Sequence, residues 1–265
     1  MLVGAAALTG LLTLHAVFAE PAFRLTALVF DSYQQIKPRE ATDPPVVVID
    51  IDEASIAKLG QWPWSRSVVA EMVTQASALG AAAIGFDIVF SEPDRTAPSR
   101  LIEAMRRQGV ELDIAAASLP DPDLALAEAA RSHAVALGIA LTNESEAPVP
   151  APKAGFSFLG QDPAKALSGY SGALSNLPGL SEAAPAIGYF SFPPSADNII
   201  RSFPLVSTAQ GKLYPALSIE TLRIAQQAGS FIVRSATSGG RLAMTDLRVG
   251  ALEVPVGPGG EMWIY

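Results

Sequence analysis

Residues 44–94 read PPVVVIDIDEASIAKLGQWPWSRSVVAEMVTQASALGAAAIGFDIVFSEPD, and this stretch decides the fold. Its aliphatic runs over residues 46–51 and 82–90 are typical of strands buried on both faces. Between them apolar residues recur at helical spacing as far as Leu79, and Gly80 follows as a C-terminal cap. A helix between two buried strands indicates a crossover unit with parallel strands. The pattern predicts an α/β layered fold, with a largely parallel central sheet flanked by helices.

Acidic residues stand at the predicted carboxyl ends of both strands: Asp50 and Asp52 on the first, Asp87 on the second. Ligands of open α/β sheets bind at this edge. An Asp-x-Asp pair after a strand is also used by phosphotransferases of the haloacid dehalogenase type, in which one carboxylate attacks phosphorus and magnesium neutralises the phosphate. None of the five lysines follows a strand in a suitable loop. The sequence therefore favours Asp52 as the cap of a helix over residues 53–59, closed by Gly60.

The loop before the long helix contains Trp62, Pro63, Trp64 and Arg66, with two of the three tryptophans in the chain. Such a loop could stack a ligand beside a cation. The simpler interpretation is a loop that closes the end of the sheet, with Arg66 paired to Asp87 or another strand-end acid. Both interpretations remain open at this stage.

A second distinctive stretch, DNIIRSFPL, places Asp197 and Arg201 on either side of a predicted turn. The two side chains could contact a ligand, and they could equally pair with each other. The candidate ligand-binding residues are therefore Asp50, Asp52, Trp62, Trp64, Arg66, Asp87, Asp197 and Arg201. No catalytic residue, metal ligand or cofactor is predicted, because the two histidines, His15 and His133, are too far apart to suggest a metal pattern.

Further along the chain the patterns predict alternating helices and strands. Helices are expected over residues 99–108, 120–131 and 217–228, the second with Asp121 or Asp123 as its cap. Strands are expected over residues 134–141, 155–159, 188–191, 199–207, 212–214, 231–234, 247–256 and 262–265. Residues 160–180 are expected to be irregular.

The first residues predict a membrane anchor. Residues 2–19 carry no charged side chain, and their 18 residues reach the lower limit for a spanning helix. A cleaved signal peptide is the alternative, but no Lys or Arg precedes the apolar run. The expected organisation is a transmembrane helix over residues 1–19, a juxtamembrane helix and linker over 20–45, and a periplasmic domain over 46–265 that is cut off at its C-terminus.

The composition argues against several classes of function. With 18 basic and 26 acidic residues the chain carries a net charge of −8, which disfavours nucleic-acid binding. Cysteine is absent, which excludes disulfides and thiolate metal sites.

Several of these segments together resemble the CHASE group of extracellular sensory domains, specifically its second type. The matching segments are VVVIDIDEASIAKLGQWPWSR, GAAAIGFDIVFSEPD, PDPDLALAEAA, GYFSFPPSADNIIRSFPLV and LYPALSIETLRIA, in the order of the family. Asn198 departs from the family pattern, which usually has glycine there, but asparagine also tolerates the turn conformation.

The resemblance implies an input domain of a membrane-bound receptor in the bacterial inner membrane, with the sensory domain in the periplasm. The output module would most resemble a class III adenylate or guanylate cyclase, with a histidine kinase or Ser/Thr kinase as the other outputs of the family. This chain would itself be no enzyme. An unidentified small molecule or environmental stimulus, the membrane and a second copy in a homodimer are the expected partners. A phosphatase-like hydrolase that uses Asp50 and Asp52, and a purely structural dimerisation domain, remain the alternatives.

Overall fold

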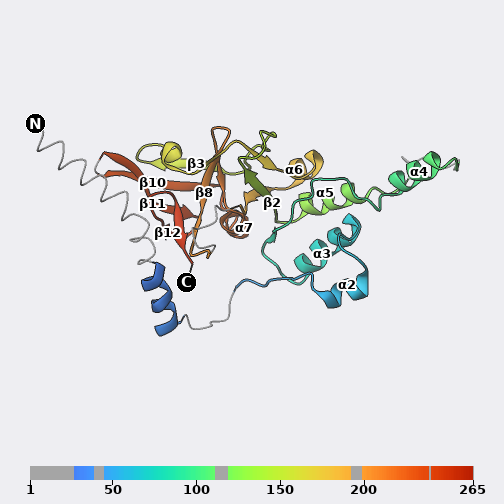
Figure 1. The fold of residues 1–265 in the computed structure, drawn as a ribbon, viewed down its shortest axis with the longest axis horizontal. Helices are drawn as coiled ribbons and strands as arrows, with labels where there is room; N and C mark the ends of the chain where they lie inside the picture. The colour runs from blue at the N-terminus through green and yellow to red at the C-terminus, as the bar shows by residue number, and fades with distance from the viewer. Residues whose placement is uncertain (1–26, 39–44, 111–118, 192–198, 239, 265) are drawn as a thin grey trace, which may run out of the picture.

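A computed structural model of the chain describes residues 27–38, 45–110, 119–191, 199–238 and 240–264. The protein is a mixed α/β structure in which helices and strands alternate along much of the chain (Figure 1). The strands of the described residues form four sheets of two to four strands, and both parallel and antiparallel pairs occur. The predicted α/β class is confirmed, and the sheets contain both parallel and antiparallel strands where the sequence predicts a largely parallel central sheet.

The first sheet is built around β2 (Val135–Thr142), which is buried along most of its length. Strand β2 pairs in parallel with β1 (Ile84–Phe86) on one side and with β6 (Ala186–Tyr189) on the other. The end of β2 also pairs antiparallel with β5 (Gly172–Leu174). An aliphatic strand with two covered faces is what residues 134–141 predict.

Helices cover this sheet on both faces. Helices α3 (Arg66–Ala78), α5 (Pro122–Ser132) and α6 (Pro178–Ala183) share one hydrophobic core with Val135 and Leu137 of β2. On the other face lies α7 (Leu217–Ala225), which approaches the sheet closely at Gly188. A Cβ atom at Gly188 would lie 2.5 Å from the Cα atom of Leu217, so only glycine fits between this strand and the helix.

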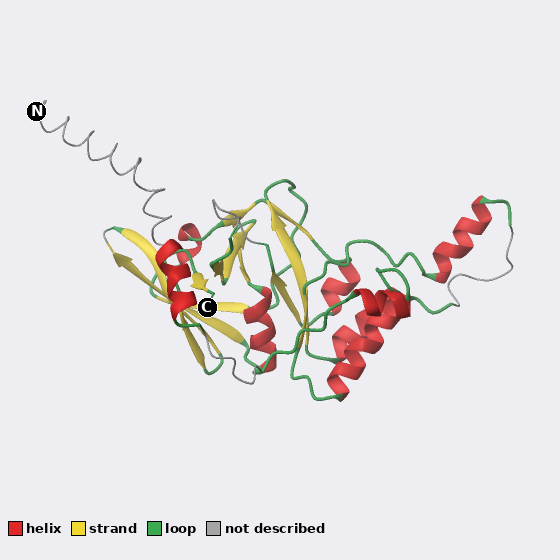
Figure 2. Ribbon diagram, turned by 60° about the horizontal axis from the view of Figure 1, so that its bottom comes forward, coloured by secondary structure: helices red, strands yellow, loops and turns green. Residues whose placement is uncertain are grey.

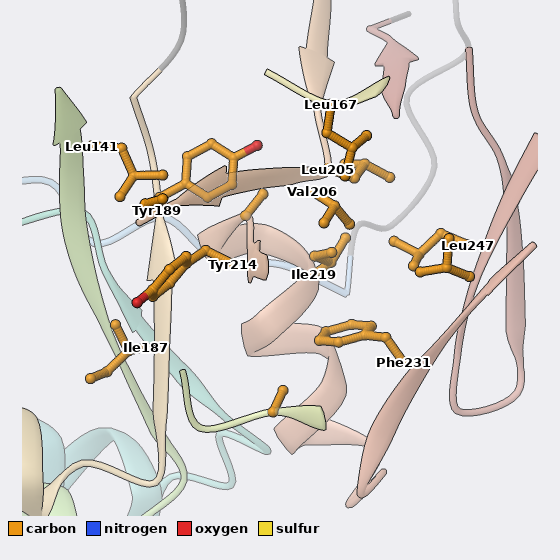
Figure 3. Packing of buried hydrophobic residues seen from close by; sticks show 14 of the residues in the cluster. Leu141, Leu167, Ile187, Tyr189, Leu205, Val206, Tyr214, Ile219, Phe231 and Leu247 are labelled. Atoms are coloured by element: carbon orange, nitrogen blue, oxygen red, sulfur yellow. The ribbon is translucent and has the colours of Figure 1, made fainter. Parts of the chain in front are cut away.

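The second half of the chain forms a separate four-stranded sheet in the order β12-β11-β10-β3. Strand β10 (Ser230–Ser238) pairs antiparallel with β11 (Arg241–Val249) and in parallel with β3 (Gly155–Leu159), while β12 (Leu252–Pro255) pairs with β11. Figure 3 shows the hydrophobic core beside this sheet, in which Phe231 and Leu247 face α7.

Short strands connect the two halves. Strand β8 (Val206–Ala209) lies between β4 (Gly169–Tyr170) and β9 (Lys212–Pro215), and β7 (Ser202–Pro204) pairs with β13 (Glu261–Trp263). A 3-10 helix over Pro163–Ala166 precedes β4. Tyr189 is fully buried at this junction, where its hydroxyl donates to the carbonyl oxygen of Pro204 and accepts from Ser207 at 2.9 Å. Its burial raises the pKa of the Tyr189 phenol, so this group stays a neutral donor.

Most predicted helices are confirmed. Helix α2 (Glu53–Leu59) begins after Asp52, whose carboxylate accepts a hydrogen bond from the Ser55 N–H at 2.8 Å, and it ends at Gly60. Helix α4 (Pro98–Arg107) matches the helix expected over residues 99–108. Asp121 caps α5, as one of the two predicted alternatives.

The strand predicted over residues 46–51 is wrong. These residues pair with no strand of the described chain, and Val46, Val47, Val48 and Ile49 are between 63% and 84% exposed. The aliphatic pattern indicates that these residues favour extended structure, but it cannot supply a neighbouring strand. In the described part of the chain β1 pairs only with β2 and is therefore an edge strand. It spans Ile84–Phe86, whereas the sequence predicts a strand over residues 82–90.

Two further predictions differ in detail. The strand expected over residues 199–207 is divided into β7 and β8 around Leu205, and the one over 247–256 is divided by the turn between β11 and β12. Residues 160–180, expected to be irregular, contain β4, β5 and the start of α6. Strands β4 and β5 have only two and three residues, and their partners β8 and β2 are distant in sequence, so no local periodicity reveals them.

None of the described helices is long and apolar enough to span a membrane. The predicted transmembrane helix over residues 1–19 lies outside the described residues. The described end of the juxtamembrane segment is helical over residues 27–36, within the predicted 20–45 region.

Candidate functional site

The loop of residues 60–66 is a compact, partly buried turn and not an open platform. The indole N–H of Trp64 donates to the carbonyl oxygen of Gly60 at 2.7 Å, and the Trp64 side chain is buried. Trp62 meets Trp64 edge to face, with ring centroids 5.4 Å apart. Arg95 spans the outside of the loop, because its guanidinium donates to the carbonyl oxygens of Gln61 and Pro63. The loop is therefore held closed by its own contacts and by Arg95.

Asp94 is the centre of the hydrogen bonds that hold this loop. Its carboxylate accepts from the Arg66 N–H at 2.6 Å, from the Ser65 hydroxyl at 3.1 Å, and from the N–H and hydroxyl of Thr96 at 2.7 Å each. Asp94 is buried, which by itself raises the pKa of a carboxyl group, but these hydrogen bonds outweigh the burial and leave the pKa of Asp94 lowered. The carboxylate is therefore an anion at neutral pH, and it accepts from the first N–H of α3 beside the N-cap residue Ser65.

Arg66 lies between this carboxylate and a second one. Its guanidinium stacks over the Phe90 ring, with 4.6 Å between Cζ and the ring centroid. Its Nε atom is 3.8 Å from Oδ1 of Asp123, which makes an ion pair longer than a hydrogen bond. Oδ2 of Asp123 accepts from the Asp94 N–H at 2.9 Å. Burial raises the pKa of Asp123, and the opposing effects of the Asp94 N–H and the Arg66 charge do not cancel it.

These contacts form what we call the Arg66 cluster: Trp64, Arg66, Phe90, Asp94 and Asp123. The cluster joins the start of α3, the segment after β1 and the start of α5, which are far apart in the sequence. Two buried atoms in it, Nε of Arg66 and Oδ1 of Asp123, have no hydrogen-bond partner among the described residues. The Arg66 guanidinium faces Asp123, and the Asp94 carboxylate is taken up by backbone and hydroxyl donors, so the cluster holds three elements in place.

A second group of contacts surrounds Arg201. The guanidinium makes a bidentate ion pair with Asp31 of the helix over residues 27–36, with both N–O distances 2.8 Å. Beside it, the Phe30 ring lies 4.8 Å from the Trp263 ring between centroids. The Ile264 N–H donates to the Arg201 carbonyl oxygen at 2.8 Å, next to the β7–β13 pair. We call Phe30, Asp31, Arg201 and Trp263 the clamp.

The clamp joins the N-terminal helix to the start of β7 and to β13, near the end of the described chain. Arg201 is 8% exposed and Asp31 is 36% exposed, so the ion pair is partly shielded from water. A bidentate pair of this kind fixes orientation as well as distance. The position of the helix over residues 27–36 therefore depends directly on the backbone position of Arg201.

The structure brings together only some of the residues predicted to bind a ligand. Trp62, Trp64 and Arg66 lie in one loop, whereas Arg201 belongs to the clamp. Asp50 and Asp87 are exposed, and in the described part of the chain neither makes a hydrogen bond or an ion pair with the others. Asp52 is occupied as the cap of α2, and Asp197 lies outside the described residues. A ligand-binding role for these eight residues stays a prediction.

The sequence reasoning missed the partners of both arginines. The Arg66 guanidinium pairs with Asp123 and the Arg66 backbone N–H donates to Asp94, neither of which is Asp87, and Arg201 pairs with Asp31, 170 residues earlier. Asp94 ends the SEPD segment directly after an aliphatic run, which was a usable signal. Nothing in the local pattern around Asp31 indicates its partner.

Comparison with known families assigns the chain. The family model of the CHASE2 domain matches residues 5–265, essentially the whole chain. The chain belongs to the CHASE2 domain family. CHASE2 domains are sensory, extracellular domains of signalling receptors and are not catalytic. This result confirms the resemblance that rests on the loop with Trp62 and Trp64, the segment that ends at Asp94, and the segment around Arg201.

A search of curated proteins and a search of solved structures found no match to this CHASE2 domain. Among the described residues, no group of three or more His, Asp or Glu side chains is arranged to hold a metal ion.

Proposed function

We propose that this CHASE2 domain is the input domain of a membrane-bound receptor that controls a class III adenylate or guanylate cyclase. The observation that carries the proposal is the clamp. It couples the helix over residues 27–36, which leads toward the predicted membrane anchor, to the sensory domain. A stimulus that shifts β7 and β13 would move Arg201 and thereby the helix.

The coupling needs a two-state element. A bidentate pair with one partner about a third exposed can open without unfolding the domain, because water can solvate the Asp31 carboxylate in the open state. A stimulus that binds one of the two states better shifts the population by its difference in affinity. Couplings of this kind are typically about 1–3 kcal/mol, which corresponds to roughly 5- to 150-fold in an equilibrium.

The receptor would be anchored in the bacterial inner membrane by residues 1–19, with the domain in the periplasm, and would act as a homodimer. Support for the anchor comes from the uncharged run of residues 2–19. Support for the dimer comes from the exposed apolar side chains of Leu101 and Met105 on α4. The stimulus is a small molecule or an environmental change.

The test is to express the gene that encodes this chain, including whatever follows codon 265, in cells that lack their own nucleotide cyclases. Cyclic AMP and cyclic GMP are then measured with the complete gene and with residues 46–265 deleted in frame. We expect formation of one cyclic nucleotide, at a rate that changes when the domain is deleted. Absence of both nucleotides at normal protein levels would contradict control of a cyclase and favour a kinase output.

The hydrolase alternative has less support. Asp52 is held by Ser55 as a helix cap, and Asp50 lies in an exposed segment outside any sheet. A magnesium-dependent phosphatase assay that shows turnover lost in Asp50→Asn would restore it.

A further inference from the structure

Helix α4 stands away from α3 and α5, although one of its side chains, Ile102, is buried. Figures 1 and 2 both show it at the end of an arm, beyond α3 and α5. Leu101 and Met105, four residues apart and hence on one face of the helix, are 56% and 45% exposed. An isolated helix of ten residues is marginal in water, so an apolar face of this kind is normally stabilised by packing against a partner.

The same helix is basic in a protein that is otherwise acidic. Since an α-helix rotates by about 100° per residue, Arg100 and Arg106 project from opposite sides of the Leu101–Met105 face. Neither of them makes an ion pair with a described residue, whereas Arg107 pairs with Glu103 within the helix. The net charge of the whole chain is −8. The partner surface that fits α4 is therefore apolar in the middle and acidic on both sides.

The groove between α3 and α5 has this character. It has a volume of about 450 Å³, and its lining residues are Ser67, Ala70, Glu71, Thr74, Ala125, Glu128, Ala129, Ser132 and His133. The small side chains of Ala70, Ala125 and Ala129 allow another helix to approach closely. Glu71 stands on the α3 wall and Glu128 on the α5 wall, where Glu128 also pairs with Arg131.

We propose that the α3–α5 groove of one copy of this chain binds α4 of a second copy. Leu101 and Met105 would lie over the alanines, and Arg100 and Arg106 would face the two glutamates. Each copy contributes one arm and one groove, so the two contacts are related by a twofold axis and the assembly closes as a dimer. The proposal rests on the homodimer of the proposed function and names its interface.

The test exchanges charges between arm and groove in the full 265-residue chain, purified in detergent. One variant carries Arg100→Glu with Arg106→Glu, and a second carries Glu71→Arg with Glu128→Arg. The control, Arg241→Glu with Arg248→Glu, makes the same change in net charge on exposed residues of β11. Light scattering across a concentration series gives the dimer dissociation constant, and circular dichroism confirms that each variant is folded.

We expect each of the first two variants alone to dimerise at least about tenfold more weakly than the wild type, because like charges then face each other. An equimolar mixture of the two should restore dimers, since both reciprocal contacts regain opposite charges. The control should dimerise like the wild type.

A second measurement does not depend on charge reversal. The chain has no cysteine, so chains with Met105→Cys and chains with Ala129→Cys can be mixed and oxidised. A disulfide between the two kinds of chain supports the proposal.

Any of three results would overturn the interface. These are wild-type dimerisation by both charge variants, a mixture of the two that stays monomeric, and the absence of a disulfide between the mixed cysteine chains. A further variant carries Met105→Cys and Ala129→Cys in the same chain. A disulfide that forms only within this chain, and not between chains, would show that α4 folds back onto its own groove. These readouts measure assembly alone, so the cyclic-nucleotide assay can succeed or fail independently of them.

Discussion

Asp94 shows how one buried carboxylate can hold the Arg66 cluster. It accepts hydrogen bonds from three residues, including the first N–H of α3, and the pKa of its carboxyl group is lowered. A carboxyl group with a lowered folded-state pKa contributes stability above its unfolded pKa of about 3.9, and this contribution is lost as the pH falls through the folded-state value.

We predict that Asp94→Asn lowers the free energy of unfolding by about 2 kcal/mol at pH 7, because the neutral amide is a weaker acceptor at the helix N-terminus. Below about pH 4 the difference from the wild type should shrink as Asp94 becomes protonated in the unfolded state, and it should vanish only below the lowered folded-state pKa. Urea unfolding at pH 7 and pH 3.5 measures both effects. A difference that is the same at both pH values would show that the Asp94 charge contributes nothing.

Asp123, in the same cluster, has a raised pKa because of its burial. A carboxyl group with a raised folded-state pKa affects the pH dependence of stability in the opposite direction to Asp94. Its contribution to stability is largest in acid and is lost as the pH rises through the folded-state pKa. The two acids therefore pull the pH dependence of stability in opposite directions, and Asp94→Asn should be studied with Asp123 left intact.

At the scale of secondary structure, the close packing of β6 against α7 depends on a residue without a side chain. The Cβ atom of Gly188→Ala would lie within 2.8 Å of two backbone atoms of Leu217, which cannot move without shifting the helix. Gly179 lies in α6, and a Cβ atom there meets nothing within 4 Å.

We predict that Gly188→Ala lowers the free energy of unfolding by about 1–3 kcal/mol, the usual cost of overpacking. The matched control Gly179→Ala should leave stability unchanged or raise it by up to about 1 kcal/mol, because alanine is the better helix former. Thermal and chemical denaturation of both variants gives the comparison. Equal effects of the two substitutions would mean that β6 and α7 are not packed so closely.

The exposed segment over residues 46–49 gives a second prediction at this scale. Val47 is 84% exposed, so Val47→Asp should change the free energy of unfolding by less than about 0.5 kcal/mol. The control Val135→Asp, in the fully buried β2, should cost several kcal/mol because it buries an unpaired charge. If Val47→Asp proves as damaging as Val135→Asp, residues 46–51 are buried as the sequence pattern predicts.

How far the sequence predicts each element depends on the distance of the interactions that stabilise it. Helix α2 could be predicted together with both caps, because Asp52 and Gly60 act within one or two turns. The strand over residues 46–51 could not, because hydrophobicity indicates only a preference and pairing depends on a partner strand. Arg66 and Arg201 could be recognised as unusual, but Asp123 and Asp31, which pair with them, come from separate parts of the fold.

At the scale of the whole molecule, the chain is a CHASE2 domain in which a clamp joins the N-terminal helix to the last described strand. Its family could be recognised because three distinctive segments occur in the right order, each of them weak alone. The clamp could not, because it forms only when residues near both ends of the described chain meet beside β7. We propose that this contact transmits the signal.

The most direct measurement of that claim is cyclic-nucleotide formation by the membrane-bound receptor carrying clamp variants. We predict that Arg201→Glu and Asp31→Arg each change the basal rate by about fivefold or more, and that the double variant, which restores opposite charges, returns toward the wild-type rate. The control Arg241→Glu, on exposed β11, should leave the rate unchanged. Wild-type rates in both single variants, at equal amounts of receptor in the membrane, would contradict the claim.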